Sequence, residues 1–230
     1  MKGIIFDLDG VICFTDKYHY QAWKILADKI GVEFTEKDND RLRGVSRMAS
    51  LEIILEKYHG SAFTPQQKEA MACEKNNTYR ELLKQMQPGD VAQEVRDTLT
   101  ALRGRGYRLA IGSSSKNARF ILERTAMTVF FDAISDGNNI SYSKPNPEVF
   151  LKAAEFLSLE PSNCAVVEDA WAGIEAAKAG GMTAVAIGSA VTSPQADIRL
   201  ERFSDLLKLF DQTLETNPRS SLSQKKCPIV

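Results

Sequence analysis

The chain has 230 residues, of which 43% are apolar and 26% charged, an ordinary composition for a globular protein. Its 29 Lys and Arg nearly balance its 30 Asp and Glu, which argues against a nucleic-acid binder that works through a basic face. We expect neither a signal peptide nor a membrane span, because no stretch is apolar and long enough. The Cys residues at 13, 73, 164 and 227 form no close pair, which favours a reducing, cytoplasmic location.

Five short apolar segments predict buried strands, at residues 3–6, 108–112, 133–135, 164–167 and 183–187. Most of them lack polar alternation, as do parallel strands that are covered on both faces. Helical patterns lie between them, at residues 91–103, 118–127, 147–157 and 171–179. Asn146 with Pro147 favours one helix start, and Gly180 favours one helix end. We therefore expect an α/β fold with a doubly wound, Rossmann-like parallel sheet.

The alternation is interrupted once, after the first strand. Residues 16–87 carry helical patterns and no convincing strand, and Thr64 with Gln67 forms a capping box for a helix that reaches about Gln85. The predicted organisation is a core of residues 1–14 and 88–215, an inserted helical cap of residues 15–87, and a frayed tail of residues 216–230. Joined by linkers at 14–16 and 87–90, the cap can move as a lid.

Two acidic pairs follow predicted strands. Asp7 and Asp9, followed by Gly10, come after the first strand, and Glu168 and Asp169 end the fourth. Ligands of parallel sheets bind beyond the carboxyl ends of the strands, where these carboxylates would repel one another without a cation. Oxygen ligands with open positions suit Mg²⁺, with a phosphate supplying a further oxygen. Taken singly, Asp-Gly is also a turn signal and Glu168-Asp169 an ordinary helix N-cap.

Two further polar stretches indicate a phosphate site. The first runs through Ser113, Ser114, Ser115, Lys116 and Asn117. It ends a strand and opens a helix, where hydroxyl and free N–H groups bind phosphate. The second contains Lys144, which would supply a positive charge for a phosphoryl oxygen. The competing interpretations are a plain Ser or Asn helix cap and a lone surface lysine.

In their order along the chain, these stretches resemble the four motifs of the haloacid dehalogenase superfamily. The motifs are Asp7-Leu8-Asp9-Gly10, Ser113, Lys144-Pro145 and Glu168-Asp169. Each is weak alone, whereas the set in this order is highly specific. The helical insert after the first motif is similar to the small α-helical cap of that superfamily.

A closer resemblance, to the β-phosphoglucomutase family, runs through cap and core to about residue 188. It rests on residues 6–12, Thr15, Tyr18-His19, Ala22-Trp23, Gly44-Val45-Ser46-Arg47, Ser50-Leu51, Lys75-Asn76, Ser115-Lys116-Asn117 and Glu168-Asp169-Ala170. The stretch at residues 44–47 is specific to the cap, so it separates mutases from general phosphatases better than the core motifs do.

The resemblance implies a role for each carboxylate. Asp7 would be the nucleophile that attacks phosphorus and forms an aspartyl phosphate. Asp9 would be the general acid and base, protonating the leaving sugar oxygen and deprotonating the accepting hydroxyl. Mg²⁺ would be held by the Asp7 carboxylate, the Asp9 backbone carbonyl and Asp169, with Glu168 ordering a bound water. The ion would remove the repulsion between the nucleophile and the phosphate.

The resemblance also implies roles for the other motif residues. Ser113 and Lys144 would bind the transferring phosphoryl oxygens, and Thr15 and His19 would orient Asp9 and couple it to cap closure. Arg47 would bind the distal phosphate with its two-pronged guanidinium. The other expected substrate-binding residues are Trp23, Gly44, Val45, Ser46, Lys75, Asn76, Ser114, Ser115, Lys116 and Asn117. For Trp23, packing in the cap core and lining of the sugar pocket are weighed evenly.

The activity that the resemblance implies is interconversion of β-D-glucose 1-phosphate and glucose 6-phosphate through the β-glucose 1,6-bisphosphate. The alternative is a sugar-phosphate phosphatase with the same cap. A non-enzymatic sugar-phosphate binder is disfavoured because every motif residue is present, and a dehalogenase because it has no use for an acid/base at Asp9. The expected partner is a small sugar phosphate, with no nucleic acid and no membrane. We expect a monomer, although the sequence carries no signal for the oligomeric state.

Overall fold

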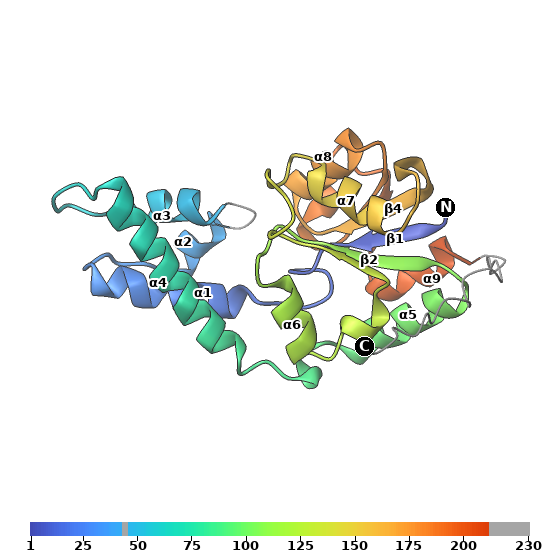
Figure 1. Cartoon of the computed structure of the whole chain (residues 1–230), viewed down its shortest axis with the longest axis horizontal. Coiled ribbons are helices and arrows are strands. Elements are labelled where there is room, and N and C mark those ends of the chain that lie inside the picture. Colours follow the sequence, from blue (N-terminus) through green and yellow to red (C-terminus); the bar gives the residue numbers. More distant parts are fainter. Residues whose placement is uncertain (43–45, 212–230) are drawn as a thin grey trace, which may run out of the picture.

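The computed structural model describes residues 1–42 and 46–211 (Figure 1). At its centre is a six-stranded sheet in the order β3-β2-β1-β4-β5-β6, in which every neighbouring pair is parallel. The strands are β1 (Gly3–Phe6), β2 (Arg108–Gly112), β3 (Ala133–Ser135), β4 (Cys164–Glu168), β5 (Thr183–Ala186) and β6 (Ile198–Arg199). The sheet confirms the predicted doubly wound α/β fold.

Helices cover both faces of the sheet (Figure 1). On one face lie α5 (Gln93–Gly104), α6 (Ala118–Arg124) and α9 (Leu206–Leu209), and on the other lie α7 (Glu148–Phe156) and α8 (Trp171–Ala179). The side chains of β1 alternate between them, since Ile4 and Phe6 belong to the first apolar cluster and Ile5 to the second. Burial on both faces explains why this strand is a continuous apolar run.

Among the residues described between β1 and α5, the regular structure is mainly helical. The helices are α1 (Asp16–Lys29), α2 (Glu36–Asp40), α3 (Arg47–Leu55) and α4 (Pro65–Leu83). They have an apolar core of their own, in which Trp23, Phe34 and Leu51 are buried, and they lie to one side of the sheet (Figure 1). The capping box of Thr64 and Gln67 opens α4 as predicted. We call these helices the cap, and the sheet with its covering helices the core.

The structure departs from the predicted elements in a few places. A sixth strand, β6, has two residues and no apolar run to predict it. The helix predicted for residues 118–127 ends at Arg124, because the Thr125 hydroxyl donates to the Ile121 carbonyl and Ala126 adopts a φ of +55°. The helix expected to reach Gln85 ends at Leu83, and other ends move by one or two residues.

Some predictions concern parts of the chain that the structure leaves undescribed. Gly44, Val45 and the tail of residues 216–230 lie outside the described residues. Within the described ranges, no helix combines the length and the apolar character needed to cross a membrane.

Candidate active site

Two carboxylates and a lysine meet where the central strands end. Asp7 follows β1 and Glu168 closes β4, and these strands are paired with Phe6 beside Val167. The Nζ of Lys144 donates hydrogen bonds to Asp7 Oδ1 and Glu168 Oε1. Because both carboxylates are buried, at 8% and 1% exposed, the lysine offsets charge that would otherwise be costly in this place.

Asp169 extends this pair into an acidic cluster. Burial, and then the charges of Glu168, Asp7 and Asp9, raise the pKa of Asp169 to about 7. Its carboxylate lies directly against the turn after β1, since a Cβ built on Gly10 would be 2.1 Å from Asp169 Oδ2. Gly10 also has a φ of +87°, so only glycine suits this close approach.

This donor set fits Mg²⁺. Asp7 and Asp169 are hard oxygen donors, and the raised pKa of Asp169 shows that the cluster favours added positive charge. Among the residues that the structure describes, no three His, Cys, Asp or Glu side chains form a preformed set of metal ligands. Two carboxylates with a backbone carbonyl suit an ion that keeps several of its waters.

Asp9 is tied to the segment that joins β1 to the cap. Its carboxylate accepts hydrogen bonds from the backbone N–H of Thr15, at 2.8 Å, and from the Thr15 hydroxyl. That hydroxyl in turn accepts one from the Tyr79 hydroxyl on α4, at 3.1 Å. Desolvation is the main cause that raises the pKa of Asp9 to about 6. The charges of Asp7 and Asp16 also raise it, whereas the two hydrogen bonds from Thr15 lower it. Such a carboxyl can exchange a proton near neutral pH.

A second chain of contacts reaches Asp9 from α4. Lys75 Nζ lies 2.9 Å from His19 Nδ1, and His19 Nε2 lies 3.9 Å from Asp9 Oδ2. Burial, and then Lys75 and Arg47, hold the pKa of His19 well below its usual range, so the ring is neutral. A protonated Lys75 donating to Nδ1 leaves the His19 N–H on Nε2, facing Asp9.

Aromatic rings enclose the Lys75 ammonium. Its Nζ lies 4.5 Å from the ring centre of Trp23 and 4.8 Å from that of Tyr79, which stacks on His19 at 4.0 Å. Trp23 is only 2% exposed and belongs to the cap core, which favours the packing interpretation. Tyr79 is absent from the predicted set, and its spacing of four residues from Lys75 on one helix is the signal that could have found it.

One side chain bridges the cap and the core. Asn76 Oδ1, on α4, accepts hydrogen bonds from Arg47 Nη2 at 2.8 Å and from Asn117 Nδ2 at 3.1 Å. Two donors from opposite sides of the cap–core boundary thus converge on one oxygen, an arrangement that also suits a phosphate oxygen. Ser46 is placed differently, since its hydroxyl accepts the Ala49 N–H as the N-cap of α3.

The predicted serines shape the loop between β2 and α6. Ser113, 3% exposed, accepts the Ser115 N–H at 3.1 Å, and the Ser115 hydroxyl accepts the Asn117 N–H at 3.2 Å. Within the described residues, the buried Ser114 hydroxyl has no hydrogen-bond partner, and Lys116 is exposed. Because β2 is the parallel neighbour of β1, the loop begins at the same edge of the sheet as the carboxylates.

Comparisons with known proteins extend over most of the chain. Residues 1–181 match the family model of haloacid dehalogenase-like hydrolases. The chain belongs to this family. It is 40% identical to the β-phosphoglucomutase of Bacillus subtilis over 209 residues. This alignment covers 90% of the present chain and 92% of the relative. The chain is also 30% identical over 184 residues to the phosphorylated carbohydrates phosphatase of Thermotoga maritima, covering 79% and 82%.

Solved structures agree with this assignment. The crystal structure of the β-phosphoglucomutase from Clostridium difficile matches with a TM-score of 0.82 and 34% identity, over 92% of this chain and 97% of that one. These findings confirm the predicted superfamily and fold. They make the chain an enzyme of the haloacid dehalogenase superfamily that is closely homologous to a phosphomutase.

Proposed function

We propose that this protein is a Mg²⁺-dependent mutase that interconverts β-D-glucose 1-phosphate and glucose 6-phosphate through the β-glucose 1,6-bisphosphate. The observation that carries the proposal is a pair of separate polar clusters, each with groups suited to a phosphate. One is the centre around Asp7, and the other is the point where Arg47 and Asn117 converge. A mutase needs both, because its bisphosphate must present either phosphate to the nucleophile while the other is held. The B. subtilis and C. difficile relatives support the choice of sugar.

The chemistry follows from the carboxylates. Asp7 attacks phosphorus, the bond from phosphorus to the sugar oxygen breaks, and an aspartyl phosphate forms. Asp9 gives its proton to the leaving sugar oxygen and later takes one from the hydroxyl that accepts the phosphoryl group. The pKa of about 6 for Asp9 supports both directions of this proton transfer, because the acid and its conjugate base are both accessible near neutral pH.

The surrounding groups stabilise the charge of the transferring phosphoryl group. Lys144 and Ser113 bind its oxygens, which is the electrostatic part of the catalysis. Asp7, Asp169 and the Asp9 carbonyl would hold Mg²⁺, which would supply positive charge against the repulsion between nucleophile and phosphate. Glu168 pairs with Lys144 and would order a water beside the ion.

The cap selects the acceptor. Residues 15–87 act as a lid on the linkers at 14–16 and 87–90, and closure excludes water from the aspartyl phosphate. Arg96 of the core donates to the Pro88 carbonyl of the second linker, and Arg124 of the core donates to the Lys84 carbonyl at the end of α4, each at 2.6 Å. That the protein is cytoplasmic and monomeric remains a prediction from the sequence.

A sugar-phosphate phosphatase is the second candidate, favoured by the T. maritima relative. It would use the same attack by Asp7, with water as the acceptor. The two candidates differ in what happens to the phosphoryl group after the first transfer.

The experiment gives the purified protein Mg²⁺, β-glucose 1-phosphate and a trace of the 1,6-bisphosphate. Glucose 6-phosphate is followed in a coupled assay, and free phosphate is measured in parallel. We expect rapid formation of glucose 6-phosphate with little free phosphate. Free phosphate without isomerisation would replace the mutase with a phosphatase, and the absence of both products would overturn both candidates.

A further inference from the structure

The lysine of the reaction centre stands on a loop in front of α7. Lys144 Nζ lies 4.6 Å from the ring centre of Phe150, in the first turn of that helix. Phe150 and its neighbour Val149 are fully buried, and α7 packs against β1, β2 and β3. Because the helix is anchored on three central strands, it is a rigid base against which the loop can be placed.

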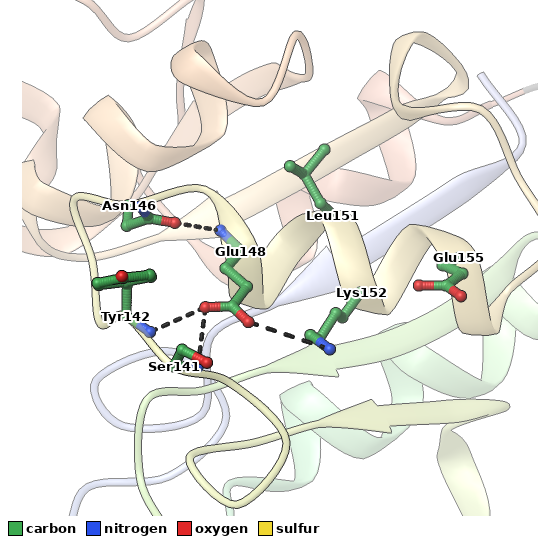
Figure 2. Close-up of a pocket in the computed structure, with 7 residues that line it drawn as sticks. All are labelled: Ser141, Tyr142, Asn146, Glu148, Leu151, Lys152 and Glu155. Carbon is green, nitrogen blue, oxygen red and sulfur yellow. Dashed lines mark hydrogen bonds and ion pairs between the residues drawn. The ribbon is translucent and has the colours of Figure 1, made fainter.

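Glu148, the first residue of α7, holds the loop to this base (Figure 2). Its Oε2 accepts the backbone N–H groups of Ser141 and Tyr142, each at 2.8 Å. At the other end of the loop, Asn146 Oδ1 accepts the Glu148 N–H at 3.0 Å. One residue therefore ties both ends of the loop that carries Lys144 to the helix.

Beyond Ile140, which packs against the core, the loop has little apolar packing. Tyr142 is 66% exposed, and an open cavity of about 370 Å³ lies beside the loop and the first turns of α7, with Leu151 and Lys152 on its wall (Figure 2). Lys152 Nζ lies 4.0 Å from Glu148 Oε1, on the far side of the carboxylate from the two N–H groups. The hydrogen bonds to Glu148 therefore hold the backbone of the loop on the side away from the ion pairs of Lys144 with Asp7 and Glu168.

We propose that Glu148 is a positioning residue for Lys144. It fixes the loop so that the ammonium lies at the transferring phosphoryl group, without touching that group itself. Hydrogen bonds to an ionised acceptor are roughly twice as strong as neutral ones, and a displacement of about 1 Å can cost about 10²-fold in rate. The inference rests on the proposed phosphoryl transfer but not on the choice between the two candidates, because Lys144 would serve a mutase and a phosphatase alike.

The first test compares single variants. Glu148→Ala should lower kcat roughly 10- to 100-fold and change KM less than about threefold, because the groups that bind the distal phosphate are untouched. Glu148→Gln retains an oxygen that can accept both N–H groups and should recover to within about threefold of wild type. Glu155→Ala, on the same helix and beside the same cavity, is the matched control and should leave kcat unchanged.

The decisive test is a double-mutant cycle with Lys144→Ala. If Glu148 acts through Lys144, adding Glu148→Ala to Lys144→Ala should change kcat by less than about twofold. An equal loss of kcat in both backgrounds would overturn the proposal, as would full kcat in Glu148→Ala. Thermal melting checks the fold of each variant, and Glu148→Met, with similar length and no acceptor, replaces the alanine variant if that one melts early.

The cycle is measured on two readouts besides isomerisation. They are hydrolysis of p-nitrophenyl phosphate and calorimetric binding of fluoroberyllate in the presence of Mg²⁺. If wild type releases phosphate without isomerising glucose 1-phosphate, the mutase proposal fails while the cycle still tests Glu148. If wild type isomerises glucose 1-phosphate and the losses of the two single variants are additive, the positioning role of Glu148 is overturned while the mutase proposal stands.

Discussion

The core and the cap hold their polar side chains in opposite ways. In the core, Asp7 and Glu168 follow strands in fixed parallel register, and Lys144 pairs with both. In the cap, Lys75 and Asn76 lie on α4, and their side chains contact His19 of the cap and Asn117 of the core. If the proposed function is right, the groups that perform the chemistry stay in place, whereas the groups that choose the acceptor are withdrawn when the cap opens.

The pKa shifts at the site also differ between the two regions. Burial and like charges raise the pKa of Asp9 to about 6 and that of Asp169 to about 7 in the core. In the cap, burial and neighbouring Arg47 lower the pKa of Lys75 to about 7, and burial lowers that of Arg47 itself. The acidic centre favours a bound cation and the basic cap favours a bound anion. A Mg²⁺ ion and a sugar bisphosphate would satisfy both.

The largest expected effect is in the core. Asp7→Asn should abolish isomerisation and hydrolysis together, by about 10⁴-fold or more, because an amide is a poor nucleophile for phosphorus. Coupled assays for glucose 6-phosphate and free phosphate measure both rates. Thermal melting serves as the control that the variant is folded. Turnover within about tenfold of wild type would remove Asp7 from the nucleophile role.

A cap variant should separate the two activities. Arg47→Ala should lower isomerisation by about 10²-fold, because a charged hydrogen bond to the distal phosphate is lost. Hydrolysis of p-nitrophenyl phosphate, which has no distal phosphate, should change less than about threefold. The exposed Arg41, which pairs with Glu56 on the cap surface, gives the matched control Arg41→Ala. Equal losses in both assays would show that Arg47 does not bind the distal phosphate.

The smallest effect concerns stability. The pKa of Lys75 is about 7 in the folded protein, against 10.5 ordinarily. Between these values the unfolded chain binds more protons, so the free energy of unfolding should rise with pH from about 7 to about 10. Lys75→Met has no buried ammonium to deprotonate or desolvate and should be more stable than wild type at pH 7, by about 2 kcal/mol. This difference in the free energy of unfolding should become smaller as pH rises.

Urea unfolding at pH 7 and pH 9.5 measures this difference. Lys84→Met, at an exposed position just after α4, is the control and should follow wild type at both values. Parallel pH dependence of wild type and Lys75→Met would contradict the lowered pKa of Lys75.

The sequence predicts the fold well wherever burial is continuous. β1 to β5 follow from short segments that are mostly apolar, and the start of α4 follows from its capping box. β6 does not, because a strand of two residues at the sheet edge is set by pairing with β5 rather than by its own composition. The end of α6 depends on a local bond from Thr125, which competes with the helix.

The site is predictable for a similar reason. Asp7 and Glu168 are found from sequence because strand ends place them, whereas Tyr79 contacts Thr15 from 64 residues away along the chain. Such a contact exists only once the cap is folded. Glu148 is missed for another reason, because its partners are backbone N–H groups that carry no residue identity.

In the proposed mechanism, the core transfers the phosphoryl group and the cap chooses its acceptor. A single turnover with 1,6-bisphosphate carrying ³²P, in the presence of excess glucose 6-phosphate, tests both roles at once. We expect the label to move from the enzyme to sugar phosphate, with only a minor fraction released as inorganic phosphate. Release of most of the label as inorganic phosphate would contradict the account, because the cap would then admit water to the aspartyl phosphate.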